Sequence, residues 1–169
     1  PSIGIYSYEL FTEYDVDTII RIGTCGAYTT DLKLFDLLNV ENSASESTYA
    51  QFAWGIEGEL IPHQGNAFEV INETASSLSI NAKATNIHTS DIFYRKDSGI
   101  PAVAEKYNCL AVEMEAFALF ANAKYLGKNA ATILTVSDVI PTHEQISADE
   151  RERALKPMIE LALESAIKL

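Results

Sequence analysis

Hydrophobic and polar residues along the chain form two kinds of stretch, which alternate. Short apolar runs rich in β-branched residues and alanine predict strands at residues 18–22, 35–40, 82–87, 109–112 and 130–136. Apolar residues spaced three or four apart predict helices at residues 1–14, 67–78, 101–107, 115–125 and 147–169. Residues 41–65 have no regular pattern and receive no assignment. This alternation predicts an α/β fold, with ligands bound at the carboxyl ends of the strands.

Glycine and proline refine the ends of these elements. Gly127 suits the end of the helix at 115–125, and the strand at 18–22 runs into Gly23-Thr-Cys-Gly26, which predicts a tight turn. Pro157 lies inside the segment 147–169, where an interior proline costs about 3 kcal/mol, so we expect the last helix to kink or break there. No repeat or linker divides the sequence, which predicts a single domain over residues 1–169.

Composition narrows the possible functions. Hydrophobic residues make up 47% of the chain and charged residues 21%, which is typical of a globular protein. The net charge of −12 repels phosphodiester backbones, so we expect no nucleic-acid partner, although a small enclosed site can still bind an anion. Cys25 and Cys109 lack the spacing of a metal site or a disulfide framework. Without a signal region or an apolar run of about 18 residues, we expect no membrane insertion and, by default, a cytoplasmic location.

The segment Arg21-Ile-Gly-Thr-Cys-Gly26 is the first candidate for chemistry. It places a cation at the end of a strand, followed by a hydroxyl group and two glycines. Backbone N–H groups in such a turn can hold an anion together with the Arg21 guanidinium. The glycine spacing matches neither a dinucleotide-binding fingerprint nor a P-loop, and a plain tight turn explains the segment equally well.

The segment Val112-Glu-Met-Glu-Ala116 follows a predicted strand and opens a helix. A carboxylate of Glu113 or Glu115 at a strand end suits the paired hydroxyl groups of a sugar. A solvated acidic helix start, favoured by the helix dipole, accounts for the same residues.

Asp138 ends the strand at 130–136, where α/β enzymes hold reacting groups, and Arg151 can return to it from the last helix. The alternative is that Asp138 caps a turn and Arg151 is an exposed cation. Phe93 follows another strand and can stack on a flat heterocycle, although core packing is the commoner role of an aromatic residue. His143 is a lone histidine, for which we expect a structural role. No Ser/His/Asp triad and no metal cluster can be assembled from the sequence.

Four motifs, taken together and in order, resemble the hexameric purine nucleoside phosphorylases. They are Arg21-Ile-Gly-Thr-Cys-Gly-Ala27, Thr89-Ser-Asp-Ile-Phe-Tyr94, Val112-Glu-Met-Glu-Ala116, and Ser137-Asp138 followed by Thr142-His-Glu-Gln145. The resemblance covers nearly the whole chain and is weakest between residues 41 and 65. It implies a three-layer α/β/α fold with a central mixed sheet. It also implies reversible phosphorolysis of purine ribonucleosides or deoxyribonucleosides to the base and pentose 1-phosphate.

The resemblance implies a role for each matching residue. Arg21 and Thr24 would bind phosphate, which is the co-substrate, and no other cofactor or metal is expected. Asp138 matches the general acid, and Arg151 matches the arginine that assists it. The nucleoside would contact Phe93, Val112, Glu113, Met114 and Glu115.

Part of the family pattern has no counterpart in this sequence. The resemblance implies strands ahead of Pro1, with a glycine and an arginine that complete the phosphate site, and a histidine and an arginine lent by neighbouring subunits. We therefore expect an N-terminally truncated fold with an exposed sheet edge, and a homo-oligomer that need not be the family's hexamer. Three functions stay open: phosphorolysis, hydrolysis of a nucleoside, and nucleoside binding or assembly without catalysis.

Overall fold

A curled mixed sheet forms the middle of the molecule. The computed structural model describes residues 1–96, 99–147, 149–150 and 155–169. Within this part of the chain the strand order is β3-β2-β4-β5-β1-β6-β7, and β2 also pairs with β6, so the sheet curls back on itself. The pairs β1–β6, β2–β4 and β4–β5 are parallel, and the others are antiparallel. The strands are β1 (Thr18–Ala27), β2 (Leu37–Ala44), β3 (Leu60–Pro62), β4 (Ala82–Thr89), β5 (Ala111–Glu113), β6 (Asn129–Val139) and β7 (Glu144–Gln145).

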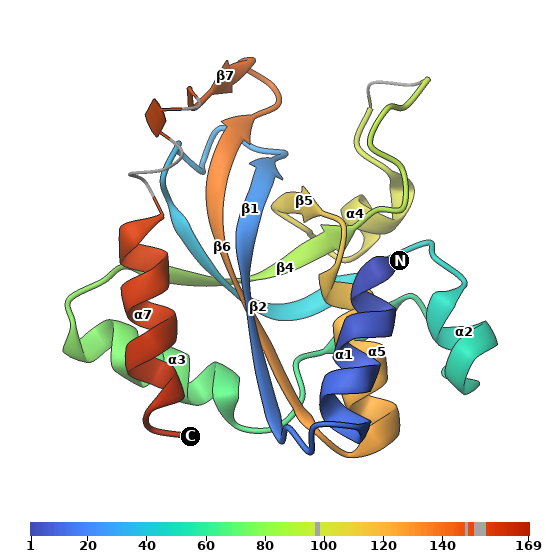
Figure 1. Cartoon of the computed structure of the whole chain (residues 1–169). Coiled ribbons are helices and arrows are strands. Elements are labelled where there is room, and N and C mark those ends of the chain that lie inside the picture. Colours follow the sequence, from blue (N-terminus) through green and yellow to red (C-terminus); the bar gives the residue numbers. More distant parts are fainter. Residues whose placement is uncertain (97–98, 148, 151–154) are drawn as a thin grey trace.

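Helices cover both faces of this sheet, which gives three layers (Figure 1). On one side lie α1 (Ser2–Thr12), α2 (Tyr49–Trp54) and α5 (Ala116–Leu126). On the other side lie α3 (Ala67–Ser77) and α7 (Lys156–Ala166), while the short α4 (Ala102–Lys106) contacts β4. The predicted α/β/α layering is confirmed. Every helix in the described residues is too short or too polar to cross a membrane.

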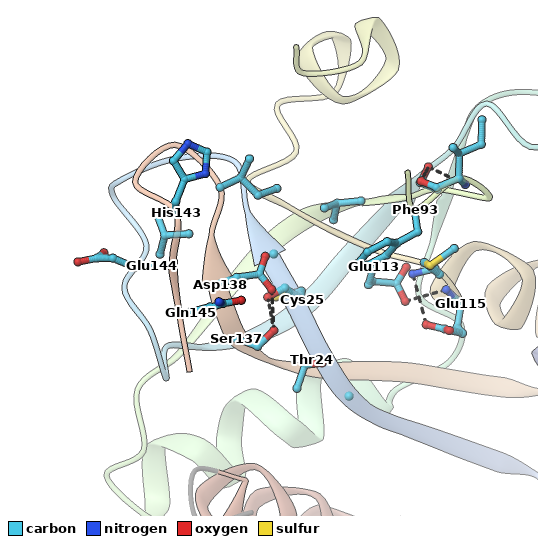
Figure 2. A pocket seen from close by; sticks show the side chains of 18 of the residues that line it. Thr24, Cys25, Phe93, Glu113, Glu115, Ser137, Asp138, His143, Glu144 and Gln145 are labelled. Carbon is cyan, nitrogen blue, oxygen red and sulfur yellow. Dashed lines mark hydrogen bonds between the residues drawn. The ribbon is translucent and has the colours of Figure 1, made fainter. Parts of the chain in front are cut away.

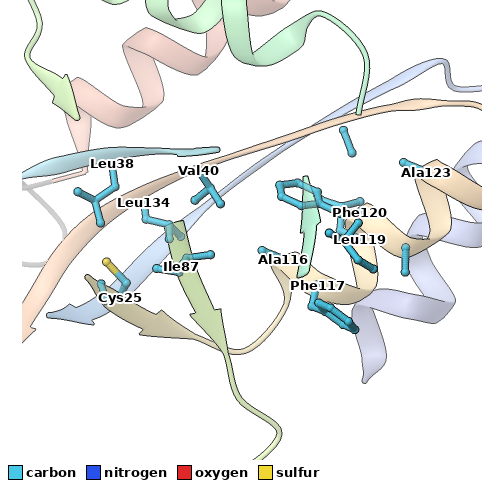
Figure 3. Close-up of a cluster of buried hydrophobic side chains, with 14 of the residues drawn as sticks. Cys25, Leu38, Val40, Ile87, Ala116, Phe117, Leu119, Phe120, Ala123 and Leu134 are labelled. Atoms are coloured by element: carbon cyan, nitrogen blue, oxygen red, sulfur yellow. The ribbon is translucent and has the colours of Figure 1, made fainter. Parts of the chain in front are cut away.

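The larger core cluster lies between α5 and the sheet (Figure 3). Phe117, Leu119 and Phe120 of α5 are fully buried against apolar side chains of the strands, among them Leu38, Val40, Ile87 and Leu134. Because α1 and α2 cover the remaining face of α5, this helix is apolar on nearly all sides, as its alanine-rich sequence requires. A second cluster packs α3 and α7 on the opposite face of the sheet.

β1 is longer than the sequence predicts. Thr18 begins the strand as expected, but Gly23-Thr-Cys-Gly26 continues it instead of forming a tight turn. The reason is the partner strand: β6 pairs with β1 along its whole length, and the extra residue is absorbed by a bulge between Cys25 and Gly26. The prediction of a tight turn here is wrong.

The other edge of β1 is largely open. On that side β1 pairs with β5 only through Gly26 and Ala27, so residues 18–25 have no strand partner there among the described residues. An exposed sheet edge was expected from the family pattern, and β1 provides it.

The helices with a clear sequence pattern have nearly the predicted ends, whereas the segment without a pattern contains elements that were not predicted. The helices predicted at 1–14, 67–78, 101–107 and 115–125 are confirmed with ends shifted by at most two residues, and Gly127 ends α5 in the left-handed conformation. The unassigned segment 41–65 contains the end of β2, all of α2, and β3. Pro157 lies in the first turn of α7, where proline is tolerated, so it causes no kink inside that helix. Residues 148 and 151–154, which belong to the predicted helix 147–169, lie outside the described residues.

Candidate active site

The ends of β1, β5 and β6 meet around one cavity of about 890 Å³ (Figure 2). Its wall contains eight of the nine residues to which the sequence assigns a role: Arg21, Thr24, Phe93, Val112, Glu113, Met114, Glu115 and Asp138. Arg151, the ninth, lies outside the described residues. Residues that are far apart in the sequence converge here because the parallel strands β1 and β6 end side by side, while β5, which is antiparallel to β1, brings Val112 and Glu113 to the same place.

Arg21 lines the cavity and lies between two carboxylates. Its Nη1 atom lies 3.3 Å from Oε2 of Glu113, and its Nη2 atom donates a hydrogen bond to Oε2 of Glu115. The guanidinium folds over Gly23, where an added Cβ would come within 2.9 Å of Nη1. Gly23 thus leaves room for the arginine head group. The sequence leaves an anion-binding turn and a plain tight turn equally open for these glycines, and the structure instead gives Gly23 a steric role within β1.

Glu113 is held by protein groups on nearly all sides. Its carboxylate accepts hydrogen bonds from the backbone N–H groups of Glu115 (2.9 Å) and Ala116 (3.0 Å), at the start of α5, and from the hydroxyl of Thr89. Burial raises the pKa of Glu113, and Arg21 and Thr89 oppose that rise. A carboxylate engaged in this way has little capacity left for a ligand. Glu113 therefore mainly fixes Arg21 and the first turn of α5.

Glu115 is better placed to contact a ligand. Its side chain is 40% exposed, whereas that of Glu113 is 1% exposed. One oxygen of Glu115 binds Arg21, and the carboxylate faces the cavity on the same side as Glu113 (Figure 2). Charge-assisted hydrogen bonds from sugar hydroxyl groups to such a carboxylate are among the stronger ones in proteins.

Asp138 lies across the cavity from this pair (Figure 2). It is opposite Gly26 in the β1–β6 register, and its Oδ1 atom accepts a hydrogen bond of 3.0 Å from the hydroxyl of Ser137. The space above Gly26 is filled by the other carboxylate oxygen, because a Cβ there would overlap Oδ2 of Asp138. The absence of a side chain at Gly26 therefore permits the observed position of Asp138.

The cavity wall has an excess of negative charge. Among the described residues that line it, Arg21 is the one Lys or Arg side chain, against the carboxyl groups of Glu113, Glu115, Asp138 and Glu144. A neutral polar ligand suits this wall, whereas a phosphate anion must compete with carboxylates for Arg21. No group of three or more potential metal ligands occurs in the described residues.

Further residues line the cavity without a site role assigned from the sequence, among them Ser90, Ile140 and His143. Ser90 follows the end of β4, and that position was the available signal for it. His143, for which a structural role was expected, is exposed at the turn between β6 and β7 and has a positive φ of 59°. It lies at the turn from which β7 runs back beside β6 (Figure 2).

Comparison with known proteins identifies the family of the chain. The sequence profile of the family described as the phosphorylase superfamily matches residues 1–167. The chain belongs to the phosphorylase superfamily. Within it, the chain is 44% identical over 172 residues to the DeoD-type purine nucleoside phosphorylase of Mycoplasma genitalium, covering 100% of this chain and 72% of that protein. It is 39% identical over 167 residues to the DeoD-type purine nucleoside phosphorylase of Colwellia psychrerythraea, covering 99% and 71%.

Solved structures share the fold of this superfamily member. The 5′-methylthioadenosine/S-adenosyl homocysteine nucleosidase of Campylobacter jejuni superposes with a TM-score of 0.85 at 21% identity, covering 98% of this chain and 76% of that one. A futalosine hydrolase mutant of Helicobacter pylori superposes with a TM-score of 0.80 at 17% identity, covering 99% and 74%. At these identities the likeness establishes the fold and leaves the reaction open.

Proposed function

We propose that the cavity binds a purine nucleoside and that the chain catalyses its phosphorolysis to the free base and pentose 1-phosphate. The observation that carries the proposal is the convergence of Arg21, Thr24, Glu115, Asp138 and Phe93 in one cavity. Relatives named as purine nucleoside phosphorylases, 36–44% identical to this chain, support the same reaction.

Each side of the cavity has a task in this proposal. Glu115 accepts hydrogen bonds from the ribose hydroxyl groups, and Met114 packs against the sugar. Phe93 and Val112 contact the base. Phosphate binds to Arg21 and the hydroxyl of Thr24, displacing part of the contact between Arg21 and Glu115.

Asp138 is the proposed general acid. Cleavage of a glycosidic bond builds positive charge on the sugar, as in glycoside hydrolysis, and negative charge on the departing purine. Phosphate stabilises the first charge and captures the sugar, and a proton delivered from Asp138 to the purine ring relieves the second. Arg151, outside the described residues, stays the predicted assistant of Asp138.

Hydrolysis by water is a second candidate, and one observation favours it. The described lining residues carry four carboxyl groups against one guanidinium, which disfavours a phosphate anion and leaves water unaffected. The two reactions differ in one requirement, because only phosphorolysis consumes inorganic phosphate.

The test follows cleavage of inosine and adenosine by absorbance, with and without phosphate, at high protein concentration. Phosphorolysis requires that cleavage depend on phosphate, and cleavage at equal rates in both buffers would show hydrolysis instead. If inosine and adenosine are cleaved in neither buffer, nucleoside binding or assembly without catalysis is the function that remains.

Asp138→Asn separates the role of the proposed acid from the binding of substrate. If Asp138 donates the proton, its loss lowers kcat by about 10²- to 10⁴-fold. Glu144→Gln is the matched control, because it removes one negative charge from the same cavity wall at an exposed position. A similar fall in kcat for both variants would indicate an effect of charge rather than proton transfer.

A further inference from the structure

A buried histidine behind the cavity connects two strand ends. His88, at the end of β4, is fully buried. Its Nδ1 atom lies 2.7 Å from the hydroxyl of Tyr28, which follows β1, and its Nε2 atom lies 2.7 Å from Oε2 of Glu46, which follows β2. The rings of Tyr28 and His88 also stack, with centroids 6.0 Å apart. None of these three side chains lines the cavity.

The direction of these hydrogen bonds follows from the chemistry of the groups. Burial lowers the pKa of His88, although Glu46 opposes that shift, so the ring is neutral near pH 7. Because an ionised carboxylate only accepts, Nε2 carries the proton and donates to Glu46. Nδ1 then accepts from the Tyr28 hydroxyl, whose pKa burial raises to about 12, so this hydroxyl keeps its proton. The network therefore fixes Glu46 as a carboxylate in one orientation.

Arg95 docks on this fixed carboxylate. Its Nη2 atom donates to Oε1 of Glu46, the oxygen that His88 does not use, and lies 3.2 Å from the hydroxyl of Ser90. Ser90 in turn closes a turn in which its hydroxyl lies 3.1 Å from the backbone N–H of Ile92. An ordinary surface ion pair contributes little, because both long side chains must be ordered to form it. Here one partner is already held by a buried ring.

The segment 90–95 carries Phe93 to the cavity wall. Phe93 is 75% exposed, and its ring forms a T-shaped pair with that of the neighbouring Tyr94, which is 90% exposed. Core packing therefore does not hold the Phe93 ring in place. Within the described residues, Arg95 makes the one side-chain hydrogen bond from this segment to the rest of the fold, to Glu46, and the backbone N–H of Ser90 donates a hydrogen bond of 2.9 Å to the carbonyl of Glu113. The hydroxyl of Ser90 bonds only within the segment.

We propose that Arg95, docked on the Tyr28–His88–Glu46 network, is a positioning residue that orders segment 90–95 and places Phe93 against the bound base. This inference rests on the proposed nucleoside-binding function. It assigns a specificity role to four residues that are remote from the reacting atoms. Removing Arg95 weakens binding of the nucleoside and leaves binding of phosphate unchanged, because Arg21 and Thr24 lie on β1 and not in segment 90–95.

The test compares Arg95→Met with Arg95→Lys and Lys96→Met. Lys96 is an exposed neighbour that makes no salt bridge or side-chain hydrogen bond with the described part of the chain, so its variant controls for loss of one positive charge. Two properties are measured: the Kd of 2-aminopurine ribonucleoside, from its fluorescence in phosphate-free buffer, and the rate of chymotrypsin cleavage after Phe93 or Tyr94, from mass spectrometry. KM values for inosine and for phosphate complete the comparison.

Arg95→Met is expected to raise the nucleoside Kd and KM by about fivefold, which is about 1 kcal/mol, and to speed cleavage at Phe93 and Tyr94. Arg95→Lys should recover part of the loss, while Lys96→Met and the phosphate KM should stay at the wild-type values. Equal Kd and equal cleavage in Arg95→Met and Lys96→Met would overturn the inference while leaving phosphorolysis intact. A wild-type chain that binds no nucleoside would overturn the proposed function, and this inference with it.

Discussion

Gly26→Ala tests the link between the backbone of β1 and the proposed acid. Gly26 has an ordinary φ, so alanine fits its backbone conformation. The added Cβ nevertheless overlaps Oδ2 of Asp138 and comes within 3.4 Å of Ile140. Because the Asp138 side chain is only partly buried, it can swing into the cavity instead of forcing β1 and β6 apart. We therefore expect the damage to appear in activity rather than in stability.

The size of the effect follows from the displacement. Restoring van der Waals contact moves the carboxylate by about 1 Å, and a misplacement of that size in an active site can cost about 10²-fold in rate. Moving the carboxylate also weakens the hydrogen bond of 3.0 Å from Ser137. The expected result is a fall in kcat of about 10²-fold, with the nucleoside KM changed by less than about threefold.

The assay is a double-mutant cycle with Asp138→Asn, read as kcat for inosine. If Gly26 acts through Asp138, the double variant is no slower than Asp138→Asn alone, because the effects of residues that act as a unit do not add. Gly99→Ala is the control, because an added Cβ there meets nothing within 4 Å in the described part of the chain. Full activity in Gly26→Ala, or additive losses in the double variant, would refute the reasoning.

Three further predictions concern the rest of the fold. Phe120 is fully buried in the core, so Phe120→Ala should lower the free energy of unfolding by about 3–5 kcal/mol in denaturant titrations. Phe52 is 83% exposed, so Phe52→Ala should change that free energy by less than about 0.5 kcal/mol. Equal effects of the two variants would contradict the packing of Phe120 in the core. Burial raises the pKa values of Cys25 and Cys109, the latter to about 12, so native protein at pH 8 should react with iodoacetamide at neither thiol until it is unfolded. Rapid labelling of either thiol in the native protein would contradict the burial of these two cysteines. Burial lowers the pKa of His88 below its usual 6.5. Below about pH 6.5 the unfolded chain therefore binds a proton at His88 more readily than the native chain does, so the free energy of unfolding should fall as the pH drops below that value. His88→Gln should flatten that slope, and an unchanged slope would show that another group causes it.

The sequence predicts a helix or strand correctly where neighbouring residues alone determine its conformation. The alanine-rich pattern around Phe117 and the stop at Gly127 predict α5 because a helix buried on all sides is apolar throughout. The extension of β1 through Gly23 and Gly26 could not be predicted locally, since glycine usually marks a turn and here the partner strand β6 decides the conformation.

The candidate site was predictable as a set of residues but not as a geometry. Glu113 and Glu115 share one motif, and only the structure distinguishes them, because one is sealed by Thr89 and the start of α5 and the other is open to the cavity. The tasks of the glycines also depend on side chains that are distant in sequence, such as Asp138 opposite Gly26. The link from His88 to Arg95 joins residues from separate elements and has no sequence motif.

The most direct test of the central claim identifies the sugar product. Inosine and inorganic phosphate are incubated with the chain, and ³¹P NMR is recorded while the release of hypoxanthine is followed by absorbance. Phosphorolysis predicts a new sugar phosphate resonance that grows in equal molar amount with hypoxanthine. Release of hypoxanthine with free ribose and no new phosphorus resonance would contradict the proposal and establish hydrolysis.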